Sequence, residues 1–205
     1  AFSTACYAFA GGAGSIIPVG SLERAYELKA KYPELVLIGE RKGQRPIGFD
    51  YGNSPTEIEA VDFTNRTIIQ TTSAGTQGIT NAVQADEIIT GSFVNARAIV
   101  SYIRSKIPAH VSLVCMGQEA LEPSDEDTLC AQFIRDSLIG NATDFVQIRS
   151  HLRTYHSAAK FFDEEKTWAP EHDFDLCLDL DRFDFVLAAR PGMYGLLCLQ
   201  RVDVR

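Results

Sequence analysis

The chain has 205 residues, of which 45% are hydrophobic and 22% are charged, a composition typical of a globular protein with one sizeable core. Its formal net charge of −8 argues against nucleic acid and anionic membranes as partners, because both repel an acidic surface. The chain has no run of 18 apolar residues. Its five widely spaced cysteines indicate free, mostly buried thiols in a reducing cytoplasm.

Short apolar runs alternate with amphipathic ones in the first part of the chain. Residues 1–10 predict a helix of small residues that ends at a Gly-Gly pair, and its uncapped start leads us to expect a preceding native segment. Residues 15–19 predict a strand, and Ser21 caps a helix that continues to about residue 31. A four-residue apolar strand is expected at 35–38.

A long polar loop, GERKGQRPIGFDYGN, follows this strand at residues 39–53. Loops of this length inside a compact domain are usually functional or disordered. Arg41 could fork onto a phosphate or sulfonate group, although a solvated charged loop is the alternative. Asp50 suits a hard divalent cation, or is an ordinary turn acid. The loop ends at Ser54, where a Pro and then a Glu predict a capped short helix.

The stretch RTIIQTTSAGTQGITNAV predicts a strand at 67–71, a small-residue turn at 72–76 and then a helix. Such a turn directs free backbone N–H groups and hydroxyls at one spot, which the helix dipole makes attractive to an anion. The turn is therefore a candidate phosphate cradle. An ordinary connection between a strand and a helix explains the same residues equally well.

The second half of the chain continues the alternation and adds a second polar loop, rich in acid, at 116–125. Ser124 and Asp127 have capping-box spacing at the start of a helix. The last two expected strands are joined by a short connection, which favours an antiparallel pair. The expected elements are strand 87–90, helix 96–106, strand 111–115, helix 128–138, helical residues 143–163, and strands 183–189 and 196–202.

Alternating strands and helices predict an α/β fold, with a three-layer α/β/α arrangement, a mainly parallel mixed sheet and a C-terminal antiparallel pair. In such sheets the ligand binds beyond the carboxyl ends of the strands. We therefore expect four loops to line one pocket there, at 39–54, 72–76, 91–95 and 116–127.

Several common phosphate- and metal-binding motifs are absent. The sequence contains no Walker A motif, no dinucleotide fingerprint after a strand and no Gly-x-Ser-x-Gly motif. Cys130 and Arg135 are too close for a cysteine-phosphatase loop, and the acidic runs lack the spacing of an aspartyl-phosphatase motif. His151 and His156 lack a third partner for a zinc site.

Five blocks in order and spacing resemble the 2-phosphosulfolactate phosphatase family: GERKGQRPIGFDYGNSP, TTSAGTQG, GSFVNARA, LVCMG and SDEDTLCAQFI. The resemblance covers residue 1 to about residue 139, with a weaker match in LCLDLDRFDFVLAA. In the family a strand that ends in Asp-Val-Leu-Arg-Ala-Thr precedes these blocks, and only the tail of that block survives here, as Ala1–Thr4. We therefore expect residues 1–205 to be a single α/β phosphatase-like domain without its native N-terminal strand.

The resemblance implies a magnesium-dependent acid phosphatase of the cytosol that hydrolyses 2-phospho-3-sulfolactate in coenzyme M synthesis, on a three-layer α/β/α fold. The resemblance also assigns roles to the residues of this sequence that match the family's site by position. Gly52 is one of the matching residues. The expected catalytic residues are Asp50, Glu126 and Asp127. The expected magnesium ligands are Glu40, Asp50 and Glu126. The expected substrate- and phosphate-binding residues are Arg41, Asn53, Ser54, Thr72, Ser73, Gly75, Thr76, Ser92 and Asn95.

This chemistry needs a metal and a cation to neutralise a phosphoryl group, together with an oriented water or a carboxylate nucleophile. The sequence leaves the choice of nucleophile open. A non-catalytic organic-phosphate binding protein and a phosphatase for a different small phosphoester are the alternative functions. A purely structural subunit would leave the acid-rich loops unexplained. A homodimer is an open alternative to a monomer.

Overall fold

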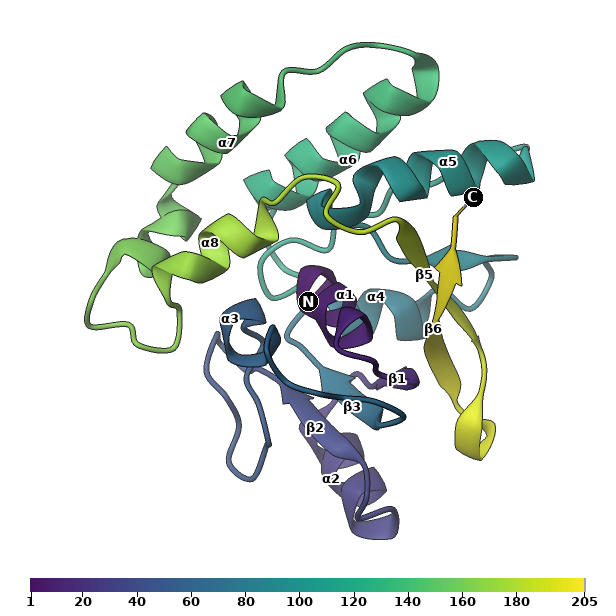
Figure 1. Ribbon diagram of the computed structural model, residues 1–205, viewed down its shortest axis with the longest axis vertical. Helices are drawn as coiled ribbons and strands as arrows, with labels where there is room; N and C mark the ends of the chain where they lie inside the picture. Colours follow the sequence, from purple (N-terminus) through teal and green to yellow (C-terminus); the bar gives the residue numbers. More distant parts are fainter. Residues whose placement is uncertain (205) are drawn as a thin grey trace.

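The computed structural model describes residues 1–204 and shows a mixed sheet with helices packed on both of its faces (Figure 1). The six strands lie in the order β2-β3-β1-β6-β5-β4. The strands are β1 Ser15–Pro18, β2 Val36–Gly39, β3 Thr67–Thr71, β4 Ile88–Ile89, β5 Phe185–Pro191 and β6 Leu197–Asp203. The α-helices are α1 Phe2–Ala10, α2 Leu22–Lys31, α3 Pro55–Ile58, α4 Gly75–Asn81, α5 Ala96–Lys106, α6 Asp125–Ile139, α7 Phe145–Thr154 and α8 Glu171–Cys177. The 3-10 helices are η1 Phe93–Asn95, η2 His156–Phe162 and η3 Met193–Gly195.

The strand directions follow from the pairings. β3 is parallel to both β1 and β2, whereas β6 is antiparallel to β1 and β5, and β5 is antiparallel to β4. Consequently β1, β2, β3 and β5 run in one direction, and β4 and β6 run in the other. The predicted α/β fold, with a mixed sheet that closes on an antiparallel C-terminal pair, is confirmed.

Alternate residues of the central strands supply two hydrophobic layers. Ile16 and Ile68 pack with α1 on one face, whereas Ile17 and Ile69 pack with α2 on the other. This division follows from the strand period of two residues. Full burial of such a side chain stabilises the fold by about 1.5–3 kcal/mol. A third cluster joins α5, α6, α7 and α8 to β5 through Val186, in the upper part of Figure 1.

Helix α1 lies between the sheet and several other helices, with contacts to α3, η1 and α8 (Figure 1). Small residues permit this close packing, and Cys6 is fully buried. The hydroxyl of Tyr7 donates a hydrogen bond to the carbonyl of Leu176 at 3.0 Å. A Cβ at Gly11, where the helix ends, would lie 2.7 Å from the carbonyl oxygen of Val61. The predicted small-residue helix and its glycine stop are confirmed.

The predicted strand at 111–115 is wrong, because these residues belong to no strand. Val114 is 74% exposed and Cys115 is exposed. An apolar, β-branched run forms a strand only where a neighbouring strand pairs its N–H and C=O groups. The sheet ends instead at β4, which has two residues.

The predicted capping box at the start of α6 is also wrong. Ser124 occupies the N-cap position, but its hydroxyl makes no capping hydrogen bond and is buried without a partner. Asp127 accepts instead from the backbone N–H of Gly117 at 2.7 Å, so this acid satisfies the preceding loop rather than the helix start. Helix α8 was not predicted, because its seven residues are too few to show a clear helical period.

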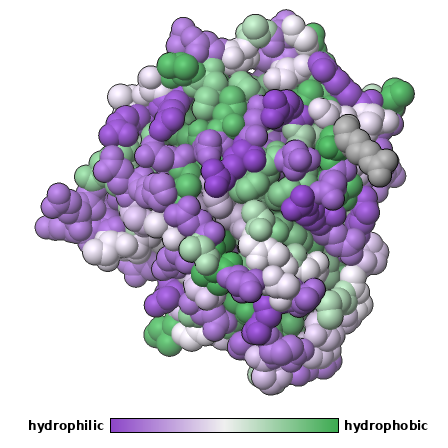
Figure 2. Space-filling view, in the orientation of Figure 1, coloured by the Kyte–Doolittle hydropathy of each residue, from purple (hydrophilic) through white to green (hydrophobic). Residues whose placement is uncertain are grey.

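All five cysteines are free and most of them are buried, as predicted. Cys6, Cys130 and Cys198 are buried, Cys177 is half-buried and Cys115 is exposed. No helix in residues 1–204 combines the length and apolar character that a membrane span requires. On the face shown in Figure 2, hydrophilic and hydrophobic residues are interspersed.

Candidate functional site

The loops that follow β2 and β3 meet at one edge of the sheet. The two strands are parallel, with Gly39 opposite Thr71, so the next residues of both strands leave the sheet side by side. The backbone N–H of Glu40 donates to the carbonyl of Thr71 at 3.1 Å, which extends the ladder by one residue. The predicted loops at 39–54 and 72–76 therefore contact each other.

Glu40 joins these two loops through its carboxylate. One carboxylate oxygen, Oε1, accepts from the backbone N–H of Ser73 at 2.6 Å. The other, Oε2, accepts from the Ser73 hydroxyl at 3.0 Å and from the backbone N–H of Gly43 at 2.8 Å. Both oxygens thus have neutral protein donors. We call Glu40, Arg41, Gly43 and Ser73 the Glu40 cluster.

Arg41 lies across the carboxyl ends of β1 and β3. Its Nη2 donates to the Thr71 hydroxyl at 2.7 Å and to the carbonyl of Gly20 at 3.3 Å, and its Nη1 donates to the carbonyl of Glu40 at 2.7 Å. None of the ion pairs within residues 1–204 involves Arg41. The guanidinium is therefore held in place by neutral oxygens and is not paired with a carboxylate at ion-pair distance within residues 1–204.

The small turn at the start of α4 is closed by its own hydroxyls. The backbone N–H of Thr72 donates to the hydroxyl of Thr76 at 3.1 Å, and the backbone N–H of Thr76 donates to the hydroxyl of Thr72 at 3.3 Å. Both residues are buried. Together with Ser73, whose N–H donates to Glu40, three amides of the predicted cradle have protein partners. Thr72 and Thr76 therefore fix the shape of the turn.

Gly75 contacts the first residues of α1. A Cβ at this position would lie 2.9 Å from the Cβ of Ala1 and 3.3 Å from the ring of Phe2. The side-chain amide of Gln70 donates to the carbonyl of Ala1 at 3.0 Å. A larger side chain at Gly75 would thus displace the start of α1, so this glycine is required for helix packing.

Ser54 is engaged in a second carboxylate cluster, which the sequence did not predict. Its hydroxyl accepts from the backbone N–H of Glu57 at 3.3 Å, as the capping prediction requires, and donates to Oδ1 of Asp173 at 2.8 Å. The same Oδ1 accepts from the backbone N–H and the hydroxyl of Thr56 at 2.9 and 2.7 Å. Asp173 is 4% exposed. We call Ser54, Thr56 and Asp173 the Asp173 cluster.

Burial raises the pKa of Asp173, and the hydrogen bonds from Thr56 and Ser54 oppose this rise only in part. Asn53, next to Ser54, accepts from the hydroxyl of Thr4 at 3.4 Å through its backbone carbonyl, and its side-chain oxygen is buried without a partner. Neither Ser54 nor Asn53 makes a hydrogen bond to the Glu40 cluster.

Ser92 and Asn95 are buried and bond to each other. The Ser92 hydroxyl donates to the side-chain oxygen of Asn95 at 2.8 Å, and the Asn95 amide donates to the carbonyl of Phe185 at 3.0 Å. Ser92 also lies against Cys6 of α1. Burial raises the pKa of the Cys6 thiol to about 12. These contacts join η1 to β5 and α1.

Of the predicted catalytic and metal-binding acids, Glu126 and Asp127 are neighbours on α6, whereas Asp50 and Glu40 bond to other segments. Asp50 accepts from the backbone N–H of Leu37 at 2.8 Å, and Glu126 accepts from the hydroxyl of Ser157 at 3.1 Å. Asp127 bonds to the loop before α6, and burial raises its pKa. None of these three acids makes a hydrogen bond or ion pair to Glu40 or Arg41.

The described residues do not fit a metal site made of three protein ligands. In the part of the chain that the structure describes, no group of three or more His, Cys, Asp or Glu residues could hold a metal ion. The predicted ligands Glu40, Asp50 and Glu126 each bond to a different segment.

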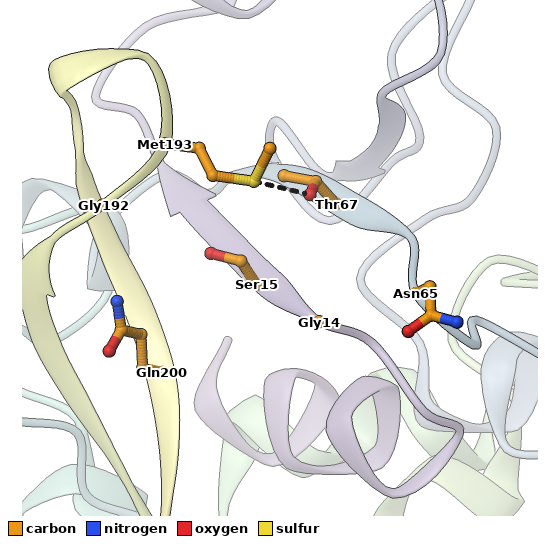
Figure 3. A pocket seen from close by; sticks show the side chains of 7 residues that line it. All are labelled: Gly14, Ser15, Asn65, Thr67, Gly192, Met193 and Gln200. Carbon is orange, nitrogen blue, oxygen red and sulfur yellow. Dashed lines mark hydrogen bonds between the residues drawn. The ribbon is translucent and has the colours of Figure 1, made fainter.

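A hollow of about 330 Å³ lies elsewhere, near the start of β1 and β3 (Figure 3). The Thr67 hydroxyl donates there to the sulfur of Met193 at 3.4 Å, from the connection between β5 and β6. The hollow contains no charged side chain and none of the predicted site residues. It is lined by Gly14, Ser15, Asn65, Thr67, Gly192, Met193 and Gln200. The pocket predicted to join the four loops stays a prediction.

Comparison with known proteins gives a consistent family assignment. The family model described as 2-phosphosulpholactate phosphatase matches residues 1–191. A probable 2-phosphosulfolactate phosphatase of Thermotoga maritima is 40% identical over 206 residues, which cover 95% of this chain and 87% of that protein. One from Bacillus subtilis is 31% identical over 192 residues, covering 93% of this chain and 83% of its own length.

A third relative matches over a shorter region. This probable 2-phosphosulfolactate phosphatase, from Thermotoga petrophila, is 42% identical over 117 residues, which cover 57% of this chain and 49% of that protein. The two longer matches include both the Glu40 cluster and the Asp173 cluster within their extent, since each covers more than nine-tenths of the chain.

Proposed function

We propose that this chain, which belongs to the 2-phosphosulpholactate phosphatase family and is a phosphoric monoester hydrolase, acts on 2-phosphosulfolactate. The substrate name denotes a lactate that carries a phosphate ester and a sulfonate besides its carboxylate. Hydrolysis breaks the bond between phosphorus and the ester oxygen, water supplies the new oxygen on phosphorus, and the leaving alkoxide takes a proton. The products are sulfolactate and inorganic phosphate.

The observation that carries the proposal is the position of Arg41. An acidic chain that binds a polyanion needs a local cation, because its overall field repels the ligand. Arg41 is fixed by Thr71, Gly20 and the backbone of Glu40 and has no carboxylate partner within the described residues. A guanidinium held in this way is preorganised to bind phosphate or sulfonate oxygens through charge-assisted hydrogen bonds.

The chain's own residues divide into two roles under this proposal. Arg41 binds an anionic group of the substrate, and the turn at 72–76 supplies the rigid neighbour against which that group is held. Asp127 is the candidate acid–base group, since its carboxyl is partly buried and this burial raises its pKa. Whether a water or a carboxylate attacks phosphorus stays open.

We also propose that the activity depends on Mg²⁺, as the family resemblance implies. Magnesium in phosphate-transfer sites is commonly held by one or two carboxylates and by substrate phosphate oxygens, so a set of three protein ligands is not required. Glu126 is a predicted ligand with an accessible carboxylate, because it is exposed and has a single hydroxyl partner. When bound, the ion would neutralise charge on the phosphoryl oxygens.

The test is release of inorganic phosphate from 2-phosphosulfolactate by the purified chain, with Mg²⁺ and with chelator. The matched control substrate is phospholactate, which lacks the sulfonate. We expect turnover of the sulfonated ester, a lower kcat/KM for the control, and loss of activity with chelator. Binding of the ester without turnover would favour the organic-phosphate binding protein. Equal kcat/KM for both esters would favour a different phosphoester as the substrate.

Three finer expectations belong to the same proposal. A cytoplasmic location and a place in coenzyme M synthesis follow from the family resemblance. A homodimer is an expectation that size-exclusion chromatography with light scattering would test directly.

A further inference from the structure

The carboxylate of Glu40 has little capacity left for a metal or a substrate. A carboxylate offers about four lone-pair positions. Three are taken by the N–H of Ser73, the hydroxyl of Ser73 and the N–H of Gly43, at distances of 2.6, 3.0 and 2.8 Å. All three donors are neutral protein groups, and hydrogen bonds of this kind to an ionised acceptor are the stronger ones.

The same carboxylate fixes the turn that carries Arg41. The backbone of Arg41 and Gln44 exchanges two hydrogen bonds, at 2.9 and 3.1 Å, which close residues 41–44 into a tight turn. Within it, Lys42 and Gly43 have left-handed backbone angles, with φ of 52° and 81°. The N–H of Gly43 donates to Glu40, so the carboxylate stabilises this turn from within.

The other side of the carboxylate is anchored to the turn at 72–76. Ser73 contributes both its N–H and its hydroxyl, and it lies two residues after Thr71, whose hydroxyl accepts from Arg41. Glu40 is itself fixed by its backbone bond to the carbonyl of Thr71. The Glu40 side chain therefore joins the Arg41 turn to the candidate cradle, beside a weaker bond at 3.4 Å from the backbone N–H of Lys42 to the Ser73 hydroxyl.

We infer that Glu40 is a positioning residue for Arg41, and neither a magnesium ligand nor a group that touches substrate. This inference rests on the proposed function, because it assigns Glu40 a role in the binding of the anion by Arg41. It replaces the metal role that the sequence predicts for Glu40. The reason is geometric. The carboxylate accepts hydrogen bonds from three protein donors, and no other acceptor in the Glu40 cluster bonds to them.

The first test needs no activity. Glu40→Gln keeps the size of the side chain, but its NH₂ group cannot accept, so one of the donors on Ser73 or Gly43 loses its partner. Hydrogen exchange of the peptides that contain residues 40–44 and 72–76 should accelerate in both segments together. Exchange that is unchanged in either segment would show that the carboxylate does not join them. Ser73→Ala, which removes one donor, is the second variant if Glu40→Gln folds poorly.

The second test is a double-mutant cycle between Glu40→Gln and Arg41→Ala, measured as kcat/KM for 2-phosphosulfolactate. Because Glu40 acts through Arg41, we expect Glu40→Gln to reduce kcat/KM by about 10- to 100-fold alone and to add little once Arg41 is absent. Multiplicative losses would overturn the inference. So would a rise of about 10-fold in the Mg²⁺ concentration that gives half-maximal activity, since loss of a ligand has that effect.

The two tests separate failure of the inference from failure of the proposed function. If the chain binds the ester without hydrolysing it, the same cycle is measured on Kd by calorimetry. If the wild-type chain neither binds nor hydrolyses the ester, the proposed function fails and Glu40 has no role in it. In that case the exchange experiment still decides whether the carboxylate joins the two turns.

Discussion

Two carboxylates in this fold are held by Ser and Thr side chains and backbone N–H groups, yet their surroundings differ. Asp173 is 4% exposed and receives all three of its donors on one oxygen. Glu40 is partly exposed, receives donors on both oxygens, and adjoins a guanidinium without a carboxylate partner in residues 1–204. The buried acid joins two helices, whereas the partly exposed acid joins two loops beside a guanidinium that has no ion pair in the described residues.

The largest effect on activity should come from Arg41→Ala. It removes a preorganised donor to an anionic group, so we expect kcat/KM to fall by about 100- to 1000-fold, as loss of such a donor typically does. Arg45 is the matched control, because it lies in the same loop and is exposed. Among the described residues it donates only to the carbonyl of Asp50, at 3.4 Å. Arg45→Ala should retain most of the activity. Equal losses of kcat/KM in Arg41→Ala and Arg45→Ala would show that Arg41 has no specific role in binding the substrate.

The largest effect on stability should come from Asp173→Leu. It leaves the hydroxyls of Ser54 and Thr56 and one backbone N–H without their acceptor, and each unsatisfied buried group costs about 1–3 kcal/mol. We expect a loss of about 3 kcal/mol in the free energy of unfolding by urea. Asp173→Asn retains an acceptor oxygen and should cost less than about 1 kcal/mol. A larger loss for the Asn variant would mean that the charge itself is needed.

A smaller effect follows from the raised pKa of Asp173. The native state binds this proton more tightly than the unfolded state does, so the contribution of Asp173 to stability falls as pH rises from about 4 through the raised native pKa. Asp173→Asn removes this dependence. The free energy of unfolding of the variant should therefore rise relative to that of the wild type as the pH is raised from about 4 to neutral. A difference between the two proteins that is constant with pH would refute the raised pKa.

The smallest effect concerns the reactivity of the thiols. Cys115 is exposed, whereas burial raises the pKa of Cys130 to about 12 and that of Cys177 to about 11. The thiolate is the reactive form, so a thiol reagent should label Cys115 first under native conditions. Mass spectrometry of the labelled peptides identifies the site. Rapid labelling of Cys130 would indicate that α6 opens readily.

The sequence predicts those parts of the fold that depend on local pattern. The apolar runs at 15–19 and 67–71 placed β1 and β3 in the sheet, and parallel pairing then implied that the loops after β2 and β3 would meet. Of the predicted site residues, the structure brings together Glu40, Arg41, Thr72, Ser73 and Thr76.

Features that depend on distant partners could not be predicted from the sequence. The three donors that bond to Asp173 lie 117 and 119 residues earlier in the chain, and no spacing rule connects them. The run at 111–115 has strand-like residues but no neighbouring strand to pair with, so the strand predicted from its pattern does not form. Ser124 and Asp127 have the spacing of a capping box, but the carboxylate of Asp127 accepts a hydrogen bond from the backbone N–H of Gly117 instead.

The most direct test of the account exchanges each carboxylate for a carboxamide, in Glu40→Gln and Asp173→Asn, and measures kcat/KM for 2-phosphosulfolactate alongside the thermal midpoint of each variant. We predict that Glu40→Gln loses about 10- to 100-fold in kcat/KM with little change in the midpoint. Asp173→Asn should keep kcat/KM within about 2-fold of the wild type, because its contacts lie in helix packing. Equal activity of the two variants, or a larger loss for Asp173→Asn, would contradict the assignment of the Glu40 cluster to function.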